Sequence, residues 1–350
     1  MKVAIVTIYD FFNHGNRLQN YALEQTIIKM GHEVTTLAVS PKKIYSLVMP
    51  LANIVPFVPV VERMKNSKKH TKKFLHNVKI GCFSTKKLER KAKNFDAFVV
   101  GSDQVWNPKY MANKKISFLE FAEKEKCVAY APSFGVEKLI EKFEDTFKNG
   151  LNHISHLSVR ENEGAKIIEN LCGEQAPVVL DPTMLLTKEE WEKFAQPVKN
   201  KPEKYVLTYF LAPKKEYKQK VEEIAQKFGL KVVNINKSFD KFFKTNPSEF
   251  VDLISSAELV CTNSFHGHAM SIALEKPFVS FMPFKSTKSR IATLLKMTGL
   301  EDRNFKTLED ENLFKLDFSA VKEKVSAERE KSLKFLTDAF AQVEKEVAHD

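Results

Sequence analysis

The sequence predicts an α/β protein built of two doubly wound, Rossmann-like domains that face each other across a cleft. Short apolar runs rich in β-branched residues alternate with helical stretches along the chain. This alternation is typical of parallel sheets with helices on both faces. The chain has 350 residues, too many for one ordinary core. Lys, Pro and Asn collect near 187–203, which marks the boundary between two series of elements.

The first series makes up an N-terminal domain that we assign to residues 1–187. Strands are expected at 3–8, 32–39, 95–101, 127–131 and 177–180, and helices at 17–30, 137–149 and 161–171. Gly31 follows the first helix, where a glycine commonly ends one.

The second series makes up a C-terminal domain at 188–318. Strands are expected at 205–211, 230–235, 259–262 and 277–282, and helices at 214–228, 247–257 and 267–274. Pro247 stands at the first turn of its helix, where proline is favoured. The charged stretch 320–347 predicts one long helix within a separate C-terminal segment, 319–350.

Composition points to an ordinary globular protein of the cytoplasm. Hydrophobic residues make up 43% of the chain and charged residues 28%. The four cysteines, Cys82, Cys127, Cys172 and Cys261, form no C-x-x-C pair, so we expect reduced, buried thiols. The apolar run in MKVAIVTIYD is too short for a signal sequence. No H-E-x-x-H motif, cysteine cluster or acidic pair has ligand spacing, so we expect neither a metal nor a cofactor.

The net charge of +11 comes from one segment, 42–93, which holds fourteen basic and two acidic residues. Within it, 44–61 is uncharged and is interrupted by Pro50, Pro56 and Pro59, which disfavour a spanning helix. We expect an interfacial patch on an anionic membrane surface. Its lysines would be Lys68, Lys69, Lys72 and Lys73.

The same segment has a plainer interpretation, a buried or oligomer-forming excursion followed by a solvated lysine helix. The sequence supports nucleic-acid binding by these lysines less well than membrane contact. Few aromatic residues lie between the lysines, and no DNA- or RNA-binding motif is present. We therefore expect no nucleic-acid partner.

The stretch GSDQVWNP, 101–108, follows the apolar run 95–100. Loops at the carboxyl ends of parallel strands are where open α/β sheets bind ligands. Asp103 and Gln104 supply hydrogen-bonding groups there. Trp106 either stacks on a ligand or anchors the loop from beneath.

The stretch TNSFHGHAM, 262–270, runs from an apolar strand into a helix that opens at small residues. Gly267 lets a backbone approach closely, and the helix N-terminus beside Ser264 is suited to an anion. His266 stands at that position, able to exchange a proton near neutral pH, and His268 follows. The alternative is a helix cap with a surface histidine.

Two arginines are candidate anion ligands. Arg160 lies in SVREN and Arg290 in KSTKSR, and a guanidinium fork fits carboxylate or phosphate. The alternative for each is a surface charge. Near the N-terminus, NHGNRLQ places Asn16 and Arg17 at the first strand–helix turn. The stretch has one glycine and no G-x-G-x-x-G motif, so it gives only weak evidence for a dinucleotide-binding site.

Taken together, these stretches resemble the polysaccharide pyruvyl transferases. The matching stretches are NHGNRLQNYAL (13–23), FDAFVVGSDQVWNP (95–108), YAPSFG (130–135), SVRENEGAKII (158–168), VLDPTMLL (179–186), TNSFHGHAMSIAL (262–274) and SRIATLLKMTGL (289–300). The resemblance implies a GT-B-like fold, phosphoenolpyruvate as the donor and a sugar of a bacterial surface glycan as the acceptor. The product would be a pyruvate ketal bridging two hydroxyls of one sugar.

The resemblance and the residues together give a candidate site. The catalytic candidates are His266, as acid, and Asp103, which would accept a proton from the sugar hydroxyls or orient them. The phosphoenolpyruvate ligands would be Arg160, Arg290, Ser264, Gly267 and His268, and the acceptor ligands Asn16, Arg17, Gln104 and Trp106. His268 departs from the small residue or Thr usual after the SFHG glycine. We expect the acceptor on the N-terminal domain and the donor on the C-terminal domain.

Three interpretations remain to be separated. The favoured one is a pyruvyl transferase peripheral to the inner face of the cytoplasmic membrane, acting on a glycan or an undecaprenyl-diphosphate-linked saccharide. A nucleotide-sugar glycosyltransferase of the same architecture is the first alternative, because fold does not fix function. A non-enzymatic basic adaptor is the second.

Overall fold

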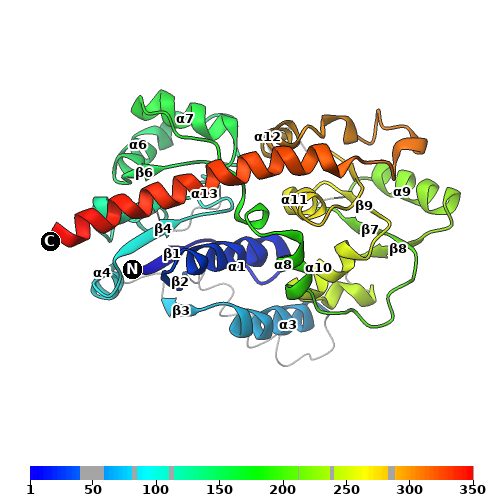
Figure 1. The fold of residues 1–350 in the computed structure, drawn as a ribbon, viewed down its shortest axis with the longest axis horizontal. Helices are drawn as coiled ribbons and strands as arrows, with labels where there is room; N and C mark the ends of the chain where they lie inside the picture. The colour runs from blue at the N-terminus through cyan, green and yellow to red at the C-terminus, as the bar shows by residue number, and fades with distance from the viewer. Residues whose placement is uncertain are drawn as a thin grey trace.

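The computed structural model describes residues 1–39, 59–80, 85–109, 114–211, 213–236, 240–282 and 288–349. Two parallel sheets, each flanked by helices, lie side by side along the long axis of the molecule (Figure 1). The predicted class, α/β with two Rossmann-like domains, is therefore confirmed.

The N-terminal sheet has six parallel strands in the order β3-β2-β1-β4-β5-β6. Its strands are β1 (Lys2–Val6), β2 (Glu33–Val39), β3 (Asn77–Ile80), β4 (Ala97–Val100), β5 (Cys127–Ala129) and β6 (His156–Leu157). The helices of this half are α1 (His14–Lys29), α3 (Pro59–Phe74), α4 (Thr85–Ala92), α5 (Lys114–Ser117), α6 (Glu144–Asn152) and α7 (Asn162–Cys172). The four residues of β4 are all buried, which explains their continuous apolar run.

The C-terminal sheet has four parallel strands in the order β10-β9-β7-β8. They are β7 (Tyr205–Tyr209), β8 (Lys231–Asn234), β9 (Leu259–Thr262) and β10 (Phe278–Ser280). The accompanying helices are α8 (Lys188–Phe194), α9 (Lys215–Lys227), α10 (Pro247–Ser255), α11 (Phe265–Ala273), α12 (Lys288–Thr298) and α13 (Phe318–His349).

Several elements differ from the sequence expectation. The strand expected at 177–180 is reduced to one parallel bridge between Val159 and Val178. The short strand β3 and the helix α12 were not foreseen. The helix expected at 137–149 begins only at Glu144, after a 3₁₀ turn at Glu141–Phe143.

The long helix α13 packs against both domains (Figure 1). It contacts α12 in the C-terminal half. On the N-terminal half, Arg329 Nε donates to the Met184 carbonyl at 2.9 Å and the Ser332 hydroxyl accepts from Leu180 N at 2.9 Å. Near its end, Phe340 packs edge-on against His32. The helix therefore joins the two domains along their length.

The helix α3 of the basic segment also joins the domains. The Arg63 guanidinium donates to the carbonyls of Phe12, at 2.7 Å, and Ile235, at 3.0 Å. His70 contacts the hydroxyl of Ser248 in α10. One face of α3 is thus buried against protein, whereas Lys69, Lys72 and Lys73 are exposed and Lys68 is partly exposed.

Residues 44–58 of the uncharged stretch lie outside the described part of the chain. None of the helices described has both the length and the apolar character needed to cross a membrane.

Candidate active site

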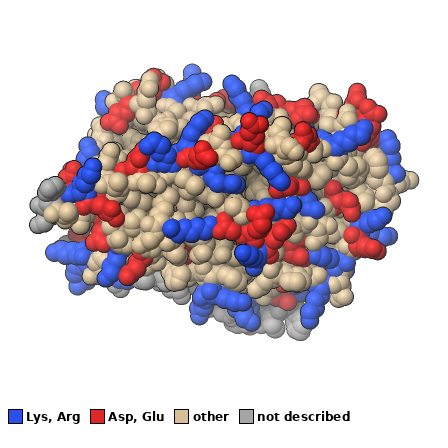
Figure 2. Space-filling view, in the orientation of Figure 1, with Lys and Arg blue, Asp and Glu red and all other residues tan. Residues whose placement is uncertain are grey.

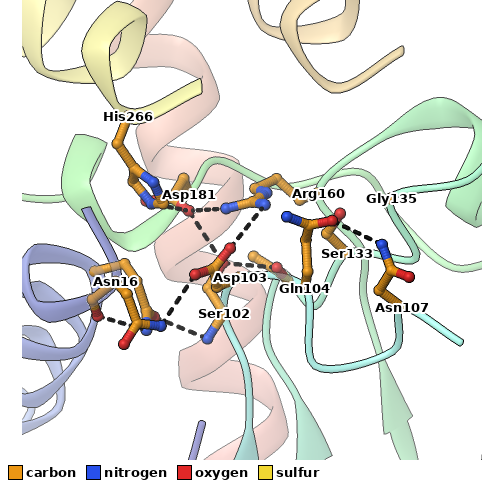
Figure 3. Close-up of polar contacts among 12 residues, drawn as sticks. Asn16, Ser102, Asp103, Gln104, Asn107, Ser133, Gly135, Arg160, Asp181 and His266 are labelled. Atoms are coloured by element: carbon orange, nitrogen blue, oxygen red, sulfur yellow. Dashed lines mark hydrogen bonds and ion pairs between the residues drawn. The ribbon is translucent and has the colours of Figure 1, made fainter. Parts of the chain in front are cut away.

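The candidate site lies where the two domains meet (Figure 3). Asp103 follows β4, Arg160 follows β6, and Asp181 follows the bridge at Val178. His266 comes from the first turn of α11, which follows β9 of the other sheet. The carboxyl ends of strands from both sheets thus bring these four side chains together, the position expected for a ligand site in α/β folds.

Asp181 is the centre of the charged network. One oxygen, Oδ2, accepts from Arg160 Nη1 at 2.6 Å and from the Ser102 hydroxyl at 3.1 Å, and lies 3.7 Å from His266 Nε2. The other oxygen caps the 3₁₀ turn at Thr183, accepting from its N–H and its hydroxyl. Burial alone would raise the pKa of Asp181, but His266 and Arg160 hold that pKa well below its ordinary value.

Arg160 is buried between two carboxylates and an aromatic ring. Its Nη2 lies 3.6 Å from Asp103 Oδ1, and its guanidinium carbon lies 4.2 Å from the centre of the Phe265 ring. Burial opposes its charge, but Asp181 and Asp103 raise the pKa of the guanidinium. Its Nε and Nη2 have no hydrogen-bond partner among the residues that the structure describes.

Asp103 is held as a carboxylate on the N-terminal domain. Its Oδ2 accepts from the Asn16 amide at 3.0 Å. Burial would raise the pKa of Asp103, yet His266, Arg160 and this hydrogen bond keep the pKa below its ordinary value. Its backbone has φ of +64°, a left-handed conformation that Asp tolerates better than most residues.

His266 sits in a close-packed position at the N-terminus of α11. The helix α1 packs so tightly against its imidazole that a side chain at Gly15 would collide with the ring. Likewise a side chain at Gly267 would collide with the Thr262 hydroxyl. The Nε2 atom is buried and makes no hydrogen bond in the described part of the chain. Ser264, at the N-cap, also forms no side-chain cap there.

Asn16 and Arg17 are present at the site, but both support it from within. Asn16 Oδ1 accepts from the Asp10 N–H and from the Arg17 guanidinium, while its amide holds Asp103. Arg17 is 1% exposed and donates to the Ile8 carbonyl at 2.6 Å. The expected contact of Arg17 with an acceptor is therefore corrected to a role in fixing Asn16.

Trp106 is corrected as well. It has no exposed surface, its indole N–H donates to the Ser117 carbonyl at 2.9 Å, and its ring packs on Phe118 and Phe134. No face of the ring is open to a sugar, so Trp106 anchors the loop. Its neighbour Gln104 is partly exposed and accepts from the Asn107 amide at 2.7 Å.

His268 is buried away from the charged network. Its Nδ1 donates to the Ser264 carbonyl at 2.7 Å, which leaves Nε2 to accept from the Ser280 hydroxyl at 2.8 Å. Burial lowers its pKa to about 4, so the ring is neutral. The expected contact of His268 with phosphoenolpyruvate is corrected to a structural link between α11 and β10.

Arg290 belongs to the same charged region. It is 8% exposed at the start of α12, and its charge lowers the pKa of Asp103. It also acts on Glu161, whose buried carboxylate accepts from the Ser133 hydroxyl and the Phe134 N–H. Arg290 therefore brings a C-terminal-domain charge to the two acidic groups of the other domain.

Asp181 is the functional residue that the sequence argument missed. The signal was present, because VVLDP predicts a strand that ends in Asp-Pro, and polar residues at that position face the ligand side of the sheet. Gln19 was also missed. Its side chain accepts from the Ser102 N–H and donates to the Thr7 hydroxyl, so it fixes the loop that carries Asp103.

Similar solved structures support the fold. A UDP-N-acetylglucosamine 2-epimerase described as putative, from Listeria monocytogenes, aligns over 94% of this chain and 91% of its own, at 10% identity and TM-score 0.52. The UDP-GlcNAc 2-epimerase of Neisseria meningitidis, solved bound to UDP-GlcNAc, aligns over 95% and 100%, at 11% identity and TM-score 0.51. An alpha-glucosyltransferase in complex with UDP and DNA aligns over 98% and 99%, at 11% identity and TM-score 0.50.

These similarities are to proteins of the GT-B architecture, which confirms the expected GT-B-like fold. A search of curated protein sequences found no significant match. The family model for polysaccharide pyruvyl transferases matches residues 13–283, a range that contains Asp103, Arg160, Asp181 and His266. The chain therefore belongs to the polysaccharide pyruvyl transferase family.

Proposed function

We propose that this protein transfers pyruvate from phosphoenolpyruvate to a sugar of a surface glycan or its lipid-linked precursor, forming a pyruvate ketal. The observation that carries the proposal is a set of buried nitrogen atoms that lie near carboxylates but make no hydrogen bond in the described part of the chain. Arg160 Nε and Nη2 and His266 Nε2 make no hydrogen bond among the described residues. Buried polar atoms are normally satisfied, so such a set favours a ligand that completes it.

The donors suit a small, multiply charged anion. Phosphoenolpyruvate carries a phosphate and a carboxylate, and Arg160 and Arg290 supply fixed positive charge for them. The first N–H groups of α11, beside Ser264 and Gly267, add a helix N-terminus of positive polarity. Both kinds of group recognise anions, and together they support donor binding at the domain junction.

The reaction begins with proton transfer from His266 to the methylene carbon of phosphoenolpyruvate. This step makes C2 oxocarbenium-like, and a sugar hydroxyl adds to C2 while its proton returns to His266. A neighbouring hydroxyl then attacks C2, the C2–O bond to phosphate breaks, and phosphate takes the second hydroxyl proton. The proton of the first hydroxyl thus replaces the one that His266 gave to the new methyl group, and the proton of the second hydroxyl leaves with phosphate. The reaction needs no cofactor.

Asp103 would orient the sugar hydroxyls. The lowered pKa of Asp103 makes its carboxylate a weak base. Asp103 would therefore accept a hydrogen bond from a sugar hydroxyl and would not retain the proton of that hydroxyl. The partly exposed Gln104 follows it on the same loop and would bind a further hydroxyl. Asn16 fixes the Asp103 carboxylate, so it acts on the acceptor through Asp103.

The product identifies the reaction. We expect phosphoenolpyruvate labelled with ¹³C at C2, incubated with the protein and a panel of pyranosides bearing free hydroxyl pairs, to yield inorganic phosphate and a ketal ¹³C signal. His266→Ala should abolish both. Transfer of sugar from a UDP-sugar, with phosphoenolpyruvate unchanged, would instead favour a glycosyltransferase.

The exposed lysines of α3 would hold the protein at an anionic membrane, on which a lipid-linked acceptor is carried. Lys69, Lys72 and Lys73 point away from the buried face of α3. In the view of Figure 2, basic side chains gather along the lower edge, where Figure 1 places α3. Each lysine near such a surface contributes about 1 kcal/mol.

Vesicle binding tests this contact. Replacing Lys69, Lys72 and Lys73 by Gln should weaken sedimentation with phosphatidylglycerol vesicles more than tenfold at low salt, without altering stabilisation by phosphoenolpyruvate. Replacing the exposed Lys218 and Lys331 of α9 and α13 should have little effect. Equal losses in both variants would argue for nonspecific attraction.

A further inference from the structure

We propose that Phe11 binds the acceptor sugar by stacking on its ring, and that Tyr9 is the residue that positions Phe11 for this contact. Both residues belong to the stretch 8–13, within the loop between β1 and α1. Trp106, the ring expected to stack on a sugar, is buried and cannot provide that contact. The inference deepens the proposed function, since it rests on a sugar being the acceptor.

The loop 8–13 lies at the edge of the N-terminal sheet where ligands are expected. The strand β1 pairs with β2 on one side and with β4 on the other, so the strand order reverses between β1 and β4. In open α/β sheets, ligands bind outside the carboxyl ends of the strands at such a point. The loop after β4 carries Asp103. The loop after β1 is its neighbour at the same edge.

Hydrogen bonds connect the loop 8–13 to Asp103. The Asp10 N–H donates to Asn16 Oδ1 at 3.0 Å, and the Asn16 amide donates to Asp103 Oδ2 at 3.0 Å (Figure 3). The Asn16 side chain alone therefore links Asp103 to the backbone that precedes Phe11. A sugar whose hydroxyls are oriented by Asp103 lies close to this loop.

The other end of the loop is fixed by α3 and by the start of α1. The Arg63 guanidinium donates to the Phe12 carbonyl at 2.7 Å, and the Phe12 N–H donates to Asp10 Oδ1 at 2.8 Å. Asn13 Oδ1 accepts from the Asn16 N–H at 3.3 Å and so caps α1. The main chain on both sides of position 11 is thus held in place. A binding element that is already ordered loses less conformational entropy when its ligand binds.

The loop combines aromatic side chains with exposure. Each of residues 8–13 is partly exposed, and three of the six are aromatic: Tyr9, Phe11 and Phe12. By contrast, four aromatic side chains near the charged network are buried: Trp106, Phe134, Tyr209 and Phe265. Sites for small organic ligands are lined by aromatic surface with a few polar groups that fix orientation. The loop supplies the first and Asp103 the second.

The ring contacts point to Phe11 as the stacking residue. The Tyr9 and Phe11 ring centres are 5.0 Å apart and their planes meet at 81°, so the edge of one ring faces the other. In this geometry Tyr9 covers at most one face of Phe11. Tyr9 is itself held by Arg17, whose guanidinium carbon lies 4.3 Å from its ring centre. The C–H groups of a pyranose pack on the negative face of an aromatic ring, which Phe11 can offer.

Saturation-transfer NMR tests the contact without catalysis. The probes are the methyl pyranosides of glucose, galactose and mannose, with inorganic phosphate present. We expect at least one to bind the wild type, and Phe11→Ala to weaken this binding at least about fivefold. Phe228→Ala is the matched control, because Phe228 is 36% exposed and packs edge-on against Phe314 in the C-terminal domain. Equal binding by Phe11→Ala and the wild type, or no probe bound by the wild type, would overturn the proposal.

Two further substitutions at position 11 separate stacking from general apolar contact. Phe11→Tyr keeps the ring and should bind the pyranoside like the wild type. Phe11→Leu keeps an apolar side chain without a flat face and should lose as much affinity as Phe11→Ala. Full binding by Phe11→Leu would refute stacking.

The positioning role of Tyr9 is tested by a double-mutant cycle. Tyr9→Ala should weaken pyranoside binding in the wild type but add little to the loss in Phe11→Ala, because Tyr9 acts through Phe11. An equal additional loss in both backgrounds would show that Tyr9 acts independently.

Stabilisation by phosphoenolpyruvate, measured on the same proteins, distinguishes this inference from the proposed function. Phe11→Ala should be stabilised as much as the wild type, since the donor residues are unchanged. Pyranoside binding without stabilisation of the wild type by phosphoenolpyruvate would refute the proposed donor and leave the role of Phe11 intact. Loss of stabilisation in Phe11→Ala would contradict the inference, because the substitution would then disturb the whole junction.

Discussion

At the scale of single residues, the polar groups divide into those that keep unused hydrogen-bonding capacity and those whose hydrogen-bonding groups are engaged within the protein. Arg160, Asp103 and His266 keep donor or acceptor capacity at the domain junction. His268 is two residues from His266 and has both ring nitrogens engaged. Similar residues in one motif therefore have different roles, decided by burial and by their partners.

His268 predicts a pH-dependent stability. Its pKa is about 4 in the folded state, against 6.5 for an unperturbed histidine, because burial disfavours the charged ring. The unfolded chain therefore takes up a proton first as pH falls, and stability present above pH 6.5 is lost progressively toward pH 4. The loss reaches about 3 kcal/mol when complete.

The measurement is urea unfolding between pH 7.5 and 4.5, comparing wild type with His268→Gln. We expect the variant to be less stable at pH 7.5 by about 1–3 kcal/mol and to show a smaller pH slope. Its stabilisation by phosphoenolpyruvate should persist. Loss of that stabilisation would restore His268 as a ligand.

Part of the site was predictable at this scale. Arg160, Asp103 and His266 were expected from residue type and from their place after apolar runs, and the structure brings them together. Trp106 was open to two interpretations, since an exposed and a buried tryptophan look alike in sequence. Asp181 was missed although the sequence predicted a strand that ends just before it; in the structure that strand is reduced to a single bridge.

At the scale of elements, α3 shows why a basic segment is hard to interpret. Its lysines lie on one face, while Arg63 and His70 on the other face bind the C-terminal domain. The charges alone suggested a segment directed outward. The buried face depends on carbonyl groups more than 150 residues away in sequence, which no local pattern reveals.

Arg63→Ala should destabilise the protein by more than about 2 kcal/mol, since it leaves the carbonyls of Phe12 and Ile235 without their donor. Lys69→Ala on the exposed face should change stability by less than about 0.5 kcal/mol. Both are measured by urea unfolding. Equal stabilities would mean that α3 is not a structural link.

The buried strands were easier to predict from the sequence than the short strand β3. The runs around β1, β4, β7 and β9 are continuously apolar because helices cover both faces of each sheet, and all four were expected. In contrast, β3 has four residues, NVKI, within a lysine-rich stretch, and it joins the sheet only through its pairing with β2.

At the scale of the whole molecule, α13 returns from the C-terminal domain to pack along the N-terminal one (Figure 1). The sequence predicted one long helix but not what this helix packs against. An amphipathic pattern shows which face of a helix is buried, but it does not show which part of the protein covers that face. Together with α3, this helix holds the domains against each other around the site.

Phe340→Ala should cost about 3–5 kcal/mol, because the ring is 2% exposed and packs on His32 of the N-terminal domain. Lys345→Ala on the same helix is the control and should change stability by less than about 0.5 kcal/mol. Thermal and urea unfolding measure both. A cost below 1 kcal/mol for Phe340→Ala would indicate that α13 does not brace the domains.

The central claim, that the charged junction binds phosphoenolpyruvate, is tested most directly by thermal melting with phosphoenolpyruvate, UDP or GDP. At about a hundred times its dissociation constant, phosphoenolpyruvate should stabilise the wild type by about 2.7 kcal/mol. We expect Arg160→Ala to lose this stabilisation, Arg329→Ala to retain it, and neither nucleotide to act. Stabilisation by UDP or GDP alone, or by phosphoenolpyruvate equally in Arg160→Ala, would contradict the account.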